Sequence, residues 1–143
     1  MSTIVLATDL TDASAAAVVW SVDLARRLGA RILVVHVLDL GRLSGLGRHE
    51  RIDQARSERE PLLMDLVRNI RAQGVDSEFL LWSGGAADGI VDAATSEAAE
   101  FIVLGTRSRR SAERMLLGSV SGRLIRTSRL PVMVVPADAS PGT

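Results

Sequence analysis

Residues 101–105 read FIVLG, an apolar run without a single polar side chain. A parallel strand covered by helices on both faces carries such a run, so we expect 101–105 at the centre of a sheet. Residues 3–9, TIVLATD, form a second β-branched run, which stops at an acid. These two segments indicate an α/β protein with two central, buried strands.

Strands and helices alternate along the rest of the chain. Further strands are expected at 31–37 (RILVVHV), 77–82 (SEFLLW) and 132–135 (VMVV). The helices between them are expected from a cap at Thr11 or Asp12 to Gly29, from Glu50 to Gly74, over 90–98 and over 119–128. Pro61 either kinks the second helix or marks its restart.

This alternation predicts a three-layer α/β fold: an open five-stranded parallel sheet in the order 3-2-1-4-5, with helices on both faces. We interpret 1–143 as a single domain, with its core at 3–136 and a frayed tail at 137–143.

The composition of the chain limits which classes of partner it can bind. The chain has 17 basic and 17 acidic residues, so no global field attracts nucleic acid or an anionic membrane. No apolar run approaches the roughly 20 residues of a membrane span, and MSTIVLATDL lacks the basic start of a signal peptide. We therefore expect a cytoplasmic protein that binds neither nucleic acid nor membrane.

Two residue types are missing. The chain has no cysteine, which excludes disulfides, thiolate catalysis and cysteine-based zinc sites. All 17 basic residues are arginine, so Schiff-base chemistry and a lysine-bearing Walker loop are excluded as well. Only His36 and His49 are available for histidine chemistry.

Ligands of such sheets bind beyond the carboxyl ends of the strands where the strand order reverses, which here means at Asp9 and Gly105. Gly118 and Ser119 precede the last helix, whose free amides suit an anion, while an acid suits ribose hydroxyls. Together these residues predict a nucleotide cleft without a catalytic base. The plainer interpretation is a turn followed by a capped helix.

Several segments resemble the universal stress protein family: IVLATDLTDAS, VVHV, SGGAADGIVDAA, IVLGTRS and LLGSVSGRLIRTSRLPVMVVP. The family's nucleotide motif is a glycine, two residues, a second glycine, nine residues, then glycine with serine or threonine. Here Gly105, Ser108 and Gly118-Ser119 keep the spacing, and serine replaces the second glycine.

The resemblance implies an adenine nucleotide alpha hydrolase-like fold, a dimer, and, in members with the motif, bound ATP (or AMP or ADP), with Mg²⁺ held through the phosphates. Carried over by position, it implies adenosine contacts from Ala7, Thr8, Asp9 and Val37. It implies that Leu104, Gly105 and Arg107 line the ribose and first phosphate, and that Ser108, Gly118, Ser119 and Val120 hold the phosphates.

Ser108 departs from the motif. If position 108 needs a left-handed backbone, a non-glycine residue costs about 1–2 kcal/mol, or roughly tenfold in affinity. The serine hydroxyl can recover part of this by bonding a phosphate, and Arg107, Arg109, Arg110 and Arg114 add local positive charge. We expect a weakened or retuned site.

Three functions follow. The first is a non-catalytic adenine-nucleotide sensor or regulator in the stress response. The second is a nucleotide-free dimeric interaction protein whose cleft Ser108 has inactivated. The third, slow ATP hydrolysis, lacks an obvious base beyond Asp9.

Other features have simpler interpretations. His36 lies within an apolar strand, where a satisfied structural histidine is the more common case. Residues 38–49 form either a lid over the cleft or a plain connection. The strand 132–135 lies between two prolines, which is typical of a sheet edge, and we expect a homodimer through Val132 to Val135.

Overall fold

The computed structural model describes residues 1–39, 47–106 and 119–141. All strand pairs are parallel, and their order β3-β2-β1-β4-β5 confirms the predicted topology. The strands are β1 (Thr3–Ala7), β2 (Arg31–Asp39), β3 (Ser77–Gly84), β4 (Phe101–Thr106) and β5 (Val132–Pro136).

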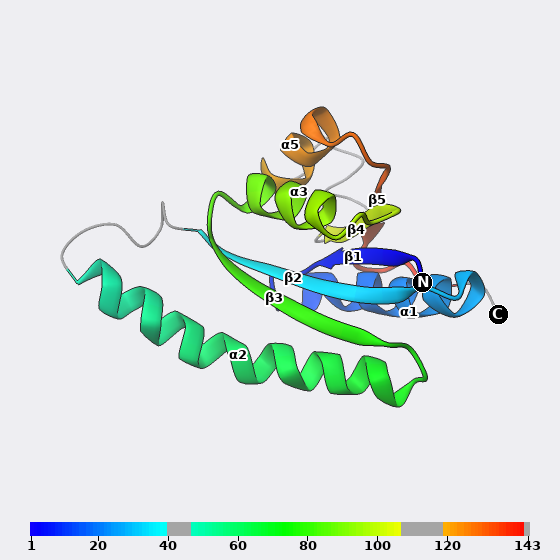
Figure 1. The fold of residues 1–143 in the computed structure, drawn as a ribbon, viewed down its shortest axis with the longest axis horizontal. Helices are drawn as coiled ribbons and strands as arrows, with labels where there is room; N and C mark the ends of the chain where they lie inside the picture. The colour runs from blue at the N-terminus through cyan, green and yellow to red at the C-terminus, as the bar shows by residue number, and fades with distance from the viewer. Residues whose placement is uncertain (40–46, 107–118, 142–143) are drawn as a thin grey trace.

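Helices cover both faces of this sheet (Figure 1). The helices α1 (Ala15–Leu28) and α2 (Arg48–Ala72) pack against one face, and α3 (Ala86–Ser96) and α5 (Ser119–Thr127) against the other. No helix in the described ranges combines the length and the apolar character that crossing a bilayer requires.

β1 lies at the centre of the sheet, and all five of its residues are buried because helices cover both of its faces. Leu6 pairs with Val34 of β2 on one side and with Val103 of β4 on the other. Side chains alternate between the faces, so Ile4 and Leu6 join the core under α1 and α2 while Val5 joins the core under α3.

Some predicted boundaries differ. β1 ends at Ala7 rather than Asp9, shortly before the turn that contains Leu10, and β2 extends to Asp39. The helix α2 runs through Pro61 as a single element, which rules out the restart, one of the two alternatives that the sequence left open. Of the segment 38–49, residues 40–46 lie outside the described residues, and so does any lid they form.

β4 and the short 3₁₀ helix Asp12–Ser14 (η1) are in backbone contact at Gly105. A Cβ atom at position 105 would lie 2.5 Å from the carbonyl oxygen of Ala13 and 3.1 Å from Cα of Ser14. Both neighbours are backbone atoms, so no side-chain rotation relieves the clash. The sequence predicted a close backbone approach at Gly105, and the structure places the chain's own η1 there.

We therefore expect Gly105→Ala to lower the free energy of unfolding by about 1–3 kcal/mol, as overpacking does in a tight interior. Gly122→Ala is the matched control, since its Cβ would lie 3.4 Å from the flexible end of Arg126 and alanine favours a helix. Urea unfolding of both variants measures the difference. Equal stability of the two variants would contradict this explanation of Gly105.

Candidate functional site

A cavity of about 590 Å³ opens at the carboxyl ends of β1 and β4, where the strand order reverses. This volume lies within the range of small-molecule sites. Eight of the predicted site residues line it: Ala7, Thr8, Asp9, Val37, Leu104, Gly105, Ser119 and Val120. The other three, Arg107, Ser108 and Gly118, lie outside the described residues.

The cavity has an apolar wall on the side of α3 and α5. Val35 and Val37 come from β2, Ile90 from α3 and Leu104 from β4. Three of these four belong to the buried core on that face and Val37 packs against it, which fixes their positions. Such a wall suits a flat, weakly polar group such as an aromatic base.

Asp9 forms the polar end of the cavity and organises the turn after β1. Its Oδ1 accepts three hydrogen bonds: from the amide of Thr11 (2.9 Å), the hydroxyl of Thr11 (2.6 Å) and the hydroxyl of Ser14 (2.8 Å). No hydrogen bond from another described residue reaches the other oxygen, Oδ2. One oxygen thus holds the fold and the other remains available to a ligand.

These bonds also set the charge of Asp9. Burial acts to raise the pKa of the carboxyl group, but the hydrogen bonds from Thr11 and Ser14 outweigh it and lower the pKa below its ordinary 3.8. The side chain is therefore ionised at neutral pH.

The predicted cap at Thr11 or Asp12 is wrong: Thr11 precedes η1 but makes no side-chain capping bond. It donates to Asp9 instead.

The same turn contains a strained residue. Leu10 has φ of +62°, a left-handed conformation that is unfavourable for a residue with a Cβ. The hydroxyl of Thr8 accepts the Leu10 amide at 3.0 Å and donates to the Ser14 hydroxyl at 3.0 Å. These hydrogen bonds stabilise the strained turn, and such strain is common at binding sites.

His36 lines the cavity and is only 4% exposed. Its Nδ1 lies 2.7 Å from the carbonyl oxygen of Thr8, and its Nε2 lies 2.7 Å from Nη1 of Arg59 on α2. A carbonyl only accepts and a guanidinium only donates, so Nδ1 carries the proton and Nε2 accepts. The histidine is thus satisfied and neutral, which agrees with the structural interpretation, yet it also lines the cavity.

Sequence reasoning missed several lining residues: Ala13, Ser14, Val35, Ala86, Ile90, Thr106 and Ser121. Thr106 carried a usable signal, since it directly follows Gly105 at the end of a central strand. The others come from helices or from positions before a strand's end, where only the folded geometry brings them to the cleft. No metal-binding cluster of three His, Asp or Glu side chains occurs in the part of the chain described.

The state of His36 predicts how stability depends on pH. Burial lowers its pKa below the ordinary 6.5, and the nearby Arg59 cation adds to this, although the bond to Thr8 and the charge of Asp9 oppose it. Below about pH 6.5, His36 binds a proton in the unfolded chain but stays neutral in the folded chain. The free energy of unfolding should therefore fall as the pH drops below that value.

His36→Gln should flatten this loss between pH 7.5 and 5.5 in urea unfolding. His49→Gln is the control, because His49 is exposed at the start of α2, and it should keep the wild-type slope. If the His36 variant and the wild-type protein lose stability in parallel, the buried neutral histidine is not the cause.

Comparison with solved structures agrees with this fold. The hypothetical protein MJ0577 superposes with a TM-score of 0.83 at 20% identity, over 94% of each chain. A universal stress protein from Archaeoglobus fulgidus, solved in complex with dAMP, has a TM-score of 0.68 at 29% identity, over 94% of this chain and 98% of that one.

Sequence relatives extend over nearly the whole chain. Universal stress protein MJ0531 of Methanocaldococcus jannaschii is 32% identical, over 92% of this chain and 80% of the relative. A universal stress protein of Thermus aquaticus is 34% identical, over 93% and 97%. The model of the universal stress protein family matches residues 1–136, and with these relatives it shows that the chain belongs to that family.

Proposed function

We propose that this protein binds ATP or a related adenine nucleotide in the cleft and acts as a non-catalytic sensor or regulator in the stress response. The observation that carries the proposal is the ionised Asp9, with one free carboxylate oxygen, in a 590 Å³ cavity that also has an apolar wall. The dAMP complex of the Archaeoglobus relative supports an adenine ligand.

The residues present fit such a ligand. The base would lie against Val37, Ala7 and Leu104, and Oδ2 of Asp9 would accept the ribose hydroxyls. The phosphates would extend toward Ser119, the first residue of α5, where free amides favour anions. Arg107, Ser108, Gly118 and Val120 complete the proposed phosphate end, where Mg²⁺ would be held through the phosphates themselves.

A sensor fits better than an enzyme. Among the described lining residues, Asp9 and His36 are the ones that titrate, and the pKa of each is lowered. Asp9 is a weak base engaged in three hydrogen bonds, and the free lone pair of His36 already accepts from Arg59. Neither group is therefore poised to activate water.

The nucleotide-free alternative depends on Ser108. Calorimetry with Mg-ATP on the wild-type protein and on Ser108→Gly separates the two cases. Binding by the wild type with little change in the variant favours the sensor, whereas binding that appears only in the variant favours the nucleotide-free protein.

Asp9→Asn tests the ribose contact while keeping an oxygen for Thr11 and Ser14. The amide nitrogen that replaces Oδ2 cannot accept a hydrogen bond, so we expect ATP and AMP affinity to fall by roughly 10- to 100-fold. Asp12→Asn, an exposed charge change in η1 outside the cleft, should bind as the wild type does. Calorimetry measures both; equal affinities would exclude Asp9 from the site.

We also propose a homodimer through β5. The carbonyl of Pro131 bonds to Ile102 of β4, so by alternation the N–H and C=O groups of Val132 and Val134 face the open edge. No described residue bonds these groups, so they can form a template on which a second copy adds its own β5.

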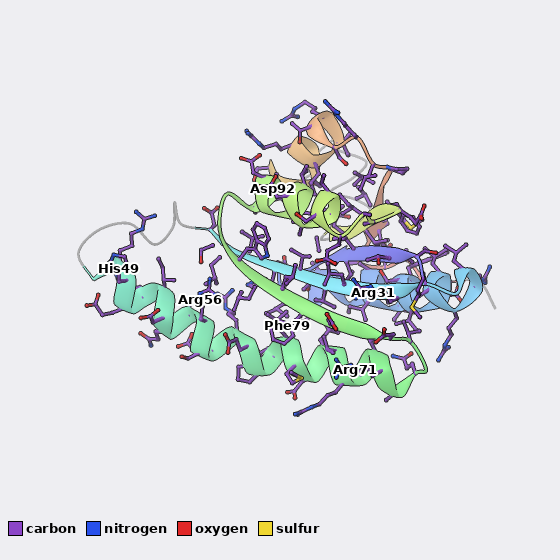
Figure 2. All side chains as sticks on the ribbon, viewed as in Figure 1. Arg31, His49, Arg56, Arg71, Phe79 and Asp92 are labelled. Atoms are coloured by element: carbon purple, nitrogen blue, oxygen red, sulfur yellow. The ribbon has the colours of Figure 1, made fainter. Side chains whose placement is uncertain are left out.

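The opposite edge of the sheet, at β3, is partly covered by α2. The carbonyl of Asp76 bonds to Ile32 of β2, so the carbonyls of Ser77 and Leu81 face away from the sheet. Arg71 donates to Ser77 at 2.9 Å and Arg56 to Leu81 at 3.3 Å, both from α2, which runs along β3 (Figure 2). Side-chain cover of this kind leaves β5 as the edge open to a partner.

Met133→Glu should therefore weaken the dimer by at least about tenfold, because paired β5 strands would bring two like charges close together. Leu62→Glu is the control, as it changes a side chain of similar exposure, 51% against 36%, on α2. Light scattering across micromolar concentrations measures both. A wild-type protein that stays monomeric there would refute the β5 dimer without affecting the nucleotide site.

A further inference from the structure

Thr106, at the wall of the cleft, has a buried hydroxyl that no described residue bonds. It is the last residue of β4 and is 7% exposed, and within 1–39, 47–106 and 119–141 its Oγ1 has no hydrogen-bond partner. The residue lines the same cavity as Asp9. A buried hydroxyl normally has a hydrogen-bond partner, so this one needs an explanation.

The direction of the side chain follows from its neighbours on β4. Gly105 faces η1, since a Cβ there would meet Ala13. Successive residues of a strand face opposite sides, so Thr106 lies on the face of Leu104, with α3 and α5. Val120 and Ser121 of α5 line the cavity on that face. Thr106 thus lies toward the end of the cleft where α5 begins.

Other orphan hydroxyls provide a comparison. Ser21 on α1 and Ser77 on β3 are also buried without a partner, at 0% and 1% exposure. Neither of them lines the cavity. An orphan hydroxyl as such is therefore not evidence for a ligand, and the position of Thr106 distinguishes it from these two.

We infer that Thr106 is a ligand-contacting residue whose hydroxyl donates a hydrogen bond to a phosphoryl oxygen of the bound nucleotide. This inference rests on the proposed function and adds a residue to it. An anionic oxygen is the matching acceptor because it strengthens the bond from a neutral hydroxyl, and the start of α5 favours negative charge at the same end of the cleft.

The inference predicts opposite effects of one substitution on the stability of the protein and on its affinity for AMP. Thr106→Val keeps the shape and removes the unpaired hydroxyl, so the ligand-free protein should melt at the same temperature or higher. The same variant should bind AMP about tenfold more weakly, as expected for one lost hydrogen bond to a charged group, and should bind adenosine as the wild type does.

Two further variants serve as controls. Thr106→Ser keeps the hydroxyl and should bind AMP within about threefold of the wild type, well inside the effect of one hydrogen bond. Ser77→Ala removes an orphan hydroxyl away from the cleft and should leave AMP affinity unchanged. Calorimetry with AMP and adenosine, and thermal melts without ligand, measure all of these.

Unchanged AMP affinity in Thr106→Val would overturn the inference while leaving the proposed function intact. An equal loss of AMP and adenosine affinity would also overturn it, since the hydroxyl would then not meet the phosphate. A wild-type protein that binds no adenine nucleotide would remove both proposals.

Discussion

The cleft depends on the three hydrogen bonds that Oδ1 of Asp9 accepts from Thr11 and Ser14. They hold the chain in a tight turn directly after β1, including the left-handed Leu10. They also lower the pKa of this exposed carboxyl group, against the opposing effect of desolvation, and so keep it charged. Because a single oxygen accepts all three bonds, the turn can be rigid without occupying the other oxygen of the same side chain.

A second set of contacts reaches the same turn from α2. Arg59 donates to His36, and His36 donates to the carbonyl of Thr8. β2 carries His36 on the face of α1 and α2, while its neighbours Val35 and Val37 line the apolar wall on the other face. Alternation along one strand therefore supplies both a structural support beneath the cleft and part of its wall.

How much of this the sequence could predict differs from residue to residue. Asp9 and Gly105 could be placed because apolar runs, strand order and the position of the switch point are properties of pattern. The cap at Thr11 was wrong because propensity does not reveal that a carboxylate two residues earlier competes for the same groups. The place of Thr106 could be read from its position after Gly105, but the state of its hydroxyl could not. That state and the Arg59 contact of His36 depend on which side chains meet across elements, and no local pattern encodes that.

The site contains two features that cost stability: the left-handed Leu10 and the Thr106 hydroxyl, which has no partner among the described residues. Such costs persist where the surrounding fold determines the geometry, and they concentrate at binding sites. If a nucleotide binds here, it stabilises the fold by about 2.7 kcal/mol at a concentration 100 times Kd. That is a large fraction of the roughly 5–15 kcal/mol that stabilises a typical domain. The proposed sensor can then register nucleotide concentration through its own stability, since occupancy alone changes the free energy of unfolding.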